Sequence, residues 1–167
     1  MPDDTQRPTG PRIGHVHLKA ADLERALGFW RDVIGLEVQQ RMDGPGGRGA
    51  VFLSADGYHH HIALNTWESA GGAAPAPGTT GLYHVALLYA DRAALAAVAR
   101  RVLAAGLRLD GASDHGVSEA LYLRDPDGNG VELYRDRAEA DWPRDGAGRL
   151  AMTTRRLDLE ALLAEPA

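Results

Sequence analysis

The feature that most constrains the fold of this chain is an internal repeat. Near the start, a segment with the alternation of a strand leads to Asp22, which can cap a helix, and Gly35 ends that helix. Farther along, the same order returns with Asp91 as the cap and Gly106 as the stop. Repetition at this scale predicts two copies of one structural unit, and it carries more weight than any single motif.

Histidine and glutamate residues recur at matching places in the two copies. His15 and His84 each stand seven positions before the capping aspartate. At the far end of each copy, His61 and Glu132 each stand four positions after a glycine. Agreement at both ends indicates that the copies share one strand–helix–strand–strand–strand order.

The repeat defines the expected domain organisation. The first module covers residues 12–68 and the second covers residues 80–137, while residues 69–79, rich in glycine, alanine and proline, form the linker. A length of 167 residues suits a single domain. We therefore expect an α+β fold in which two paired βαβββ modules form a cupped mixed sheet around a functional site.

The two ends of the chain carry less information. Residues 1–11 lack the basic and apolar regions of a secretory signal and are expected to be a flexible lead. Residues 138–167 are expected to form a tail that crosses the surface and ends in a short helix at about 158–163. This tail shows no residue pattern with an evident chemical role.

Composition narrows the classes of function. The formal net charge of -5 argues against a nucleic acid or an anionic membrane as partner, and no apolar run is long enough to span a bilayer. The chain has no cysteine, which excludes disulfides, thiolate metal sites and cysteine nucleophiles. A cytoplasmic location is the default expectation.

A metal site follows if the modules pair about a pseudo-twofold axis, because equivalent strand positions then meet near that axis. His15 and His84 would come from first strands, and His61 and Glu132 from last strands. Two imidazoles and a carboxylate form the facial triad that leaves positions open on iron(II), although the same ligands also suit a catalytic zinc. Glu132 stands in the apolar run GVELY, where a buried carboxylate needs a partner or a cation. The alternative is that Glu132 lies on a solvated sheet face.

Neighbouring histidines leave further alternatives open. His17 competes with His15 for the first ligand position, but we expect it to be a pocket or core residue. In the stretch YHHHIALN, a strand would place His59 and His61 on one side and His60 on the other. We expect His61 to be a fourth ligand or to face the open metal positions, and His59 to be dispensable. A solvated surface position is the alternative for one or two of the three.

The stretch HGVSEALYLRDPDGNGVE carries a resemblance to a known family. It resembles the ring-cleavage signature of the type I extradiol dioxygenases, within the vicinal oxygen chelate superfamily that also includes glyoxalase I, fosfomycin-resistance thiol transferases and bleomycin-binding proteins. The resemblance covers about residues 12–137, and the chain is most similar to one module pair of a catechol 2,3-dioxygenase. Ser113 departs from the pattern, and many extradiol enzymes carry four modules rather than two. The matching positions are His115, Leu121, Tyr122, Asp125, Pro126, Gly128 and Glu132.

The resemblance implies a metal and its ligands. By position, His15, His84 and Glu132 would bind iron(II), with manganese(II), zinc(II) or nickel(II) as alternative ions. The partners implied are a small catechol-like aromatic substrate and dioxygen, and two-module members of the superfamily commonly form homodimers.

The resemblance also implies catalytic roles. His115 would lie beside the bound dioxygen or substrate, and Tyr122 would hydrogen-bond a substrate oxygen. His60 occupies roughly the place of the acid–base histidine, with His61 as the alternative. Without those roles, Tyr122 would be a core aromatic residue and His115 a solvated turn residue.

The sequence therefore predicts an iron(II)-dependent extradiol dioxygenase. A first alternative is another metal-dependent enzyme of the superfamily, such as a glyoxalase-like lyase or isomerase or a thiol transferase. A tight fourth ligand at His61 would favour it, because that ligand would fill a position that dioxygen or catechol needs. A second alternative is a metal-free drug-binding resistance protein, but such a protein has no need of His15, His84 and Glu132.

Overall fold

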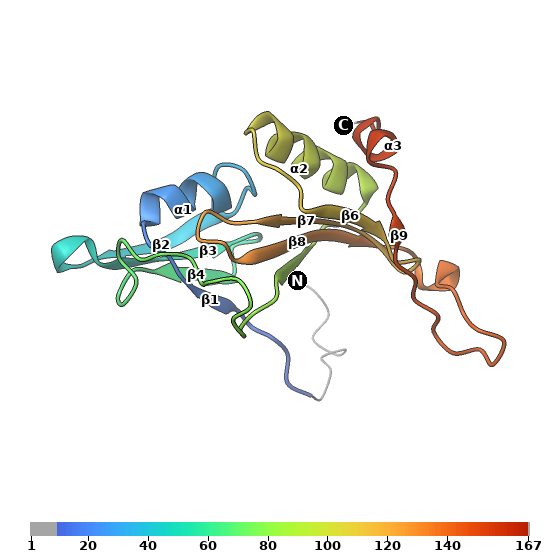
Figure 1. Ribbon diagram of the computed structural model, residues 1–167, viewed down its shortest axis with the longest axis horizontal. Coiled ribbons are helices and arrows are strands. Elements are labelled where there is room, and N and C mark those ends of the chain that lie inside the picture. Colours follow the sequence, from blue (N-terminus) through green and yellow to red (C-terminus); the bar gives the residue numbers. More distant parts are fainter. Residues whose placement is uncertain (1–9, 167) are drawn as a thin grey trace.

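Two βαβββ modules, each with its own mixed sheet, form the protein in a computed structural model that describes residues 10–166 (Figure 1). The strand orders are β1-β4-β3-β2 in the first sheet and β5-β8-β7-β6-β9 in the second. The first module consists of β1 (Val16–Lys19), α1 (Leu23–Trp30), β2 (Glu37–Asp43), β3 (Gly49–Ser54) and β4 (Ile62–Asn65), with a short 3-10 turn at Pro45–Gly47. The second consists of β5 (Val85–Leu88), α2 (Arg92–Ala104), β6 (Gly111–Asp114), β7 (Ser118–Arg124) and β8 (Gly130–Asp136).

The predicted helix starts are confirmed by their caps, and α2 ends at Ala104 just before Gly106, whereas α1 ends at Trp30, before the predicted stop at Gly35. The side chain of Asp22 accepts a hydrogen bond from the backbone N–H of Arg25 at 2.7 Å, and Asp91 does the same for Ala94 at 2.8 Å. Each cap satisfies one of the N–H groups that the first turn of a helix leaves unpaired. The two modules therefore begin their helices by the same device.

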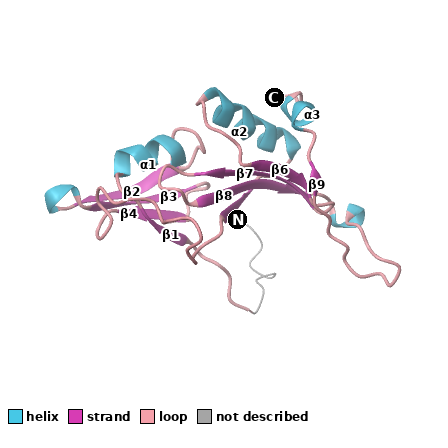
Figure 2. Ribbon diagram, viewed as in Figure 1, coloured by secondary structure: helices cyan, strands magenta, loops and turns pink. Residues whose placement is uncertain are grey.

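Both helices cover the same face of the two sheets (Figures 1 and 2). The apolar faces of α1 and α2 bury Leu27, Trp30, Leu95 and Val98 in one hydrophobic core, which continues through the strands of both modules. A core shared in this way makes the two modules parts of one folded unit. Within residues 10–166, no helix covers the opposite face of the sheets, which carries the polar residues described below.

Polar contacts also join the modules. Asp127, in the turn between β7 and β8, accepts hydrogen bonds from the backbone N–H of Ala21 and the guanidinium of Arg25 in the first module. From the second helix, Arg101 donates to the carbonyl oxygens of Val33 and Ile34 at 2.9 Å. The expected cupped sheet is nevertheless two sheets, because no hydrogen-bonded ladder joins β1 to β5 within residues 10–166.

The C-terminal tail packs on the second module. It forms a 3-10 turn at Glu139–Asp141, a short strand β9 (Arg155–Arg156) at the edge of β6, and helix α3 (Leu159–Leu163), capped by Asp158. The short helix predicted near residues 158–163 is confirmed, whereas β9 carries no signal in the sequence. Among the described residues, no helix is both long and apolar enough to cross a membrane.

Candidate metal centre

The candidate site lies on the helix-free face of the second sheet and begins with a contact between His84 and Glu132. Nε2 of His84 lies 2.9 Å from Oε2 of Glu132. The Glu132 side chain is only 14% exposed, so the carboxylate is largely removed from water and depends on such partners. His84 immediately precedes β5, and Glu132 lies in β8, which pairs with β5.

Strand register brings Tyr122 to the same carboxylate. Tyr122 in β7 stands directly opposite Glu132 in β8, and directly opposite residues of neighbouring strands project from the same face. The hydroxyl of Tyr122 donates to Oε1 of Glu132 at 3.1 Å. Burial, together with the nearby negative charge of Glu132, raises the pKa of Tyr122 to about 12, so this hydroxyl keeps its proton at neutral pH.

His115 extends the chain of contacts. Its Nε2 lies 2.7 Å from the hydroxyl oxygen of Tyr122. Its Nδ1 lies 2.9 Å from the backbone carbonyl oxygen of Thr153, in the C-terminal tail. The four side chains of His84, Glu132, Tyr122 and His115 thus form one continuous series of polar contacts, and three of them belong to the extradiol-like motif.

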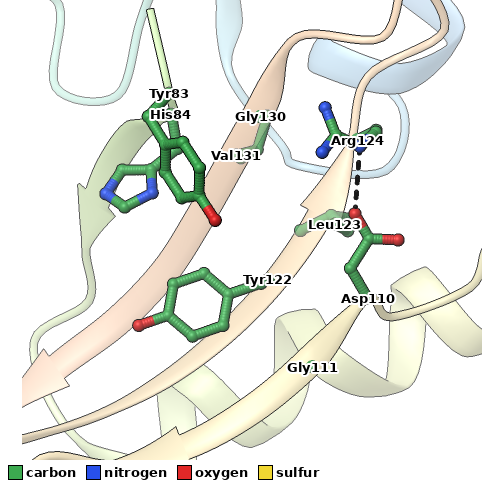
Figure 3. Close-up of a pocket in the computed structure, with 9 residues that line it drawn as sticks. All are labelled: Tyr83, His84, Asp110, Gly111, Tyr122, Leu123, Arg124, Gly130 and Val131. Carbon is green, nitrogen blue, oxygen red and sulfur yellow. Dashed lines mark ion pairs between the residues drawn. The ribbon is translucent and has the colours of Figure 1, made fainter. Parts of the chain in front are cut away.

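A pocket of about 210 Å³ adjoins this series (Figure 3). His84 and Tyr122 line one side of it, and the ion pair between Arg124 and Asp110 closes the other end. Gly111, which pairs with Tyr122 in the β6–β7 ladder, lines the pocket without a side chain. The arrangement leaves space for a small planar molecule beside the polar groups.

The histidines of the first module form a separate cluster. The ring of His15 packs against that of His60, with 4.3 Å between centroids, and His60 also packs on Phe52 at 5.1 Å. Nδ1 of His60 lies 2.8 Å from Nδ1 of His59. Partial burial, and to a smaller extent the neighbouring His15, lower the pKa of both His60 and His17. Protons are therefore easier to remove from these rings than from a free histidine.

The predicted ligands are thus only partly brought together. His84 and Glu132 touch, whereas His15 lies in the first-module cluster and lines a groove of about 720 Å³ between β1 and β5. Within residues 10–166, no three His, Asp or Glu side chains stand close enough together to hold a metal ion. His17 is a pocket residue rather than a core residue: it lines a pocket with residues of both modules, and its Nε2 lies 2.8 Å from the side-chain amide nitrogen of Asn65.

The His84–Glu132 pair supplies two donors of the types that bind metals, at a spacing compatible with a shared ion. Two donors bound at right angles to one ion, each at about 2.1 Å, lie about 3 Å apart, close to the observed 2.9 Å. His84 Nδ1 is buried without a hydrogen-bond partner among the described residues. No bond of Nδ1 to a neighbour therefore holds the ring in its present position.

The expectation that His61 is equivalent to Glu132 is wrong. The ladders pair Val16 with Ile62 and Val85 with Val131, so the first-module position that corresponds to Glu132 is Ala63. The β3–β4 connection is two residues longer after its glycine than the β7–β8 turn, and counting from the glycines hides this difference.

The expected strand at YHHHIALN also begins later than predicted. Residues 59–61 form a bend before β4, so they do not alternate between two faces. His61 turns back to its own loop, where Nδ1 accepts from the N–H of Ala55 at 3.3 Å and Nε2 lies 3.8 Å from Asp56. His61 still borders the same groove as His15, but His60 is the residue in contact with the His15 ring.

Sequence reasoning missed one contributor to the site and one contact that joins the modules. Thr153 acts through its backbone carbonyl, which leaves no signature in a side-chain pattern. Asp127 stands in the recognised DPDG turn, yet its partners Ala21 and Arg25 belong to the other module. Only the three-dimensional pairing of the modules shows that contact.

Comparison with known proteins gives the family. The profile of the Glyoxalase/Bleomycin resistance protein/Dioxygenase superfamily matches residues 12–133. The chain is 44% identical to the catechol-2,3-dioxygenase of Bacillus subtilis (strain 168) over 92% of this chain and 51% of that protein. It is 34% identical to biphenyl-2,3-diol 1,2-dioxygenase 3 of Rhodococcus globerulus over 75% of this chain and 64% of that protein. The chain therefore spans about half to two thirds of the length of these relatives.

Solved structures share the fold. A lactoylglutathione lyase from Agrobacterium tumefaciens superposes with a TM-score of 0.56 at 25% identity, covering 77% of this chain and 96% of that one. A glyoxylase/bleomycin resistance protein/dioxygenase domain from Frankia sp. EAN1pec reaches a TM-score of 0.66 at 19% identity, covering 77% of this chain and all of that one. With the profile match over residues 12–133, these findings show that the chain belongs to the glyoxalase/bleomycin resistance protein/dioxygenase superfamily.

Proposed function

We propose that this protein is an iron(II)-dependent extradiol-type dioxygenase that cleaves a catechol-like aromatic ring. The observation that carries the proposal is the series His84–Glu132–Tyr122–His115. In it, two side chains of the types that bind metals, His84 and Glu132, lie next to two that can donate or accept protons. The names of the relatives support the reaction class, because one is a catechol and the other a biphenyl-diol dioxygenase.

The proposed ligands are His15, His84 and Glu132. His84 and Glu132 already have a suitable spacing, and His15 lines the groove that separates β1 from β5. Binding of one ion by all three ligands requires His15 to approach the pair, because no three such side chains are close together within residues 10–166. Bound iron(II) would supply coordination of the two catechol oxygens and activation of dioxygen.

The residues around the pair have separate tasks. Tyr122, which keeps its proton because its pKa is about 12, donates a hydrogen bond to a negatively charged oxygen of the substrate. His115 gives or takes a proton at Nε2, the ring nitrogen that faces Tyr122. His60, in contact with His15, takes the remaining phenolic proton of the catechol, a role for which His61 is turned the wrong way.

Turnover tests the proposal directly. Protein loaded with iron(II) and mixed with a catechol should consume oxygen and form a yellow ring-opened product. His115→Ala should keep its iron and slow turnover by about 10²–10⁴, the usual contribution of a positioned proton-handling group. The matched control is His17→Ala, which changes an exposed histidine that contacts Asn65 and has no proposed role in turnover.

One result would contradict the proposal. A protein that is active with zinc on a thiol adduct or an epoxide, and inert with iron(II), oxygen and catechols, cannot use dioxygen chemistry, because zinc has no accessible second redox state. The function would then be that of a lyase, an isomerase or a thiol transferase.

A further inference from the structure

The C-terminal tail makes direct contact with the proposed active site. Nδ1 of His115 lies 2.9 Å from the carbonyl oxygen of Thr153. The backbones are also joined, because the N–H of Thr153 donates to the carbonyl oxygen of His115 at 3.0 Å. A residue whose ring and main chain are both bound to one partner residue has little freedom to rotate.

The tail is anchored on both sides of this contact. After it, β9 pairs with β6 and the N–H of Leu157 donates to the carbonyl oxygen of Ala112 at 3.2 Å. Leu162 of α3 is fully buried in the core, and Arg100 of α2 donates to the carbonyl oxygens of Leu163 and Glu165 at 3.0 Å. These contacts hold the segment after Thr153 against the second module.

The segment before Thr153 is fixed as well. The indole N–H of Trp142 donates to the carbonyl oxygen of Arg137 at 2.9 Å, and the N–H of Ala151 to that of Pro143 at 2.8 Å. Pro143 packs against the turn that follows His115. At Gly116, where φ is +76°, an added Cβ would come within 2.8 Å of the proline ring. The turn and the tail therefore fit together only because residue 116 has no side chain.

The Thr153 contact determines where the ring carries its proton. A backbone carbonyl only accepts hydrogen bonds, so the Nδ1 that faces it must be protonated. Nε2 is then the nitrogen left to exchange a proton. When it is unprotonated, Nε2 accepts from the Tyr122 hydroxyl at 2.7 Å. When it is protonated, it donates to that oxygen while Tyr122 donates to Glu132 at 3.1 Å. The hydroxyl has a single proton, so in the first arrangement it donates to Nε2 and no longer to Glu132, and only the second keeps both hydrogen bonds.

We propose that the tail, residues 138–166, is a positioning element of the active site: the carbonyl of Thr153 fixes the His115 ring in the Nδ1–H form, so that Nε2 faces the reaction. The consequence for turnover rests on the proposed function, whereas the position of the proton does not. One competing partner lies nearby, because the hydroxyl of Thr154 is 3.4 Å from Nδ1. A hydroxyl can donate as well as accept, so it would not fix the proton.

Nitrogen-15 NMR of the 167-residue chain, labelled at histidine, shows which ring nitrogen of His115 carries the proton, and it does not depend on turnover. The signals of His115 are identified by their loss in His115→Ala. Above the pH at which its ring has lost one proton, the wild type should show the Nδ1–H form, which is the minor form of free histidine in water. An Nε2–H form in the wild type would overturn the proposal, and this reading does not depend on the folding of any further variant.

Three variants identify the partner. Thr153→Ala keeps the backbone carbonyl and Thr154→Val removes the competing hydroxyl, so both should keep the Nδ1–H form. Thr153→Pro removes the N–H that binds the His115 carbonyl and displaces the segment, so it should give mixed forms. A change of form in Thr154→Val would overturn the assignment to the Thr153 carbonyl.

Turnover separates this proposal from the proposed function. With iron(II) loaded, Thr153→Pro should lower kcat at least tenfold, with KM and iron content close to those of Thr153→Ala. An unchanged kcat in a variant with mixed ring forms would overturn the positioning role. If the wild type shows the Nδ1–H form but cleaves no catechol, the contact stands and the proposed dioxygenase function fails.

Discussion

At the scale of single residues, Tyr122 joins the proton-handling part of the site to the metal-binding part. Its one hydroxyl lies between Nε2 of His115 and Oε1 of Glu132. Because its pKa is about 12, it acts as a neutral donor and not as a phenolate. Its contribution is therefore that of hydrogen bonds rather than of charge.

The variant Tyr122→Phe measures that contribution. It removes the hydroxyl and keeps the ring, so we expect kcat to fall by about tenfold, which corresponds to about 1.4 kcal/mol and is the size expected for one or two lost hydrogen bonds. Iron content should not change. Tyr89→Phe, which alters a partly buried tyrosine on the groove between β1 and β5, is the matched control. A loss as large as that of His115→Ala would contradict the account, since Tyr122 would then be carrying the proton itself.

Residue patterns predicted the second-module half of the site well. His115, Tyr122 and Glu132 belong to one strand–turn–strand motif, whose ladder brings Tyr122 and Glu132 face to face. The prediction for His61 was wrong because it depended on a count along the chain rather than on a ladder between strands. Its position was counted from Gly57, and the two extra residues of the bend before β4 shift the register, which only strand pairing reveals.

At the scale of elements, the turn between β7 and β8 connects the two modules. Asp127 binds the backbone N–H of Ala21 and the guanidinium of Arg25 at the start of α1. The sequence identified this turn, the aspartate caps located the starts of both helices, and Gly106 located the end of the second, because these signals are local. It did not identify the partners of Asp127 or the strand β9, because both depend on contacts between distant segments.

Asp127→Ala tests this connection. Removal of the carboxylate leaves the Ala21 N–H without its partner, so the free energy of unfolding should fall by about 1–3 kcal/mol. Urea denaturation followed by circular dichroism measures it. Glu68→Ala, which breaks an exposed ion pair with Lys19, should cost no more than about 1 kcal/mol. If the two variants lost the same free energy of unfolding, the contacts of Asp127 with the first module would not stabilise the protein more than an exposed ion pair does.

At the scale of the whole molecule, the two sheets share a core but are not joined by hydrogen bonds between β1 and β5. Composition and repeat predicted the α+β fold and the module order, because these depend on local patterns repeated twice. The relative placement of the sheets depends on the shared core and on contacts between distant segments, such as those of Asp127 and Arg101, and no local sequence pattern describes it. That placement decides whether His15 reaches His84 and Glu132.

The metal content of the protein, purified without oxygen, tests the central claim most directly. Elemental analysis should find one divalent ion per wild-type chain, and His15→Ala, His84→Ala and Glu132→Ala should each lose it while remaining folded. His17→Ala, which alters an exposed histidine two positions from His15, should keep the ion. Full occupancy in His15→Ala would contradict the account, because the first module would then supply no ligand at that position.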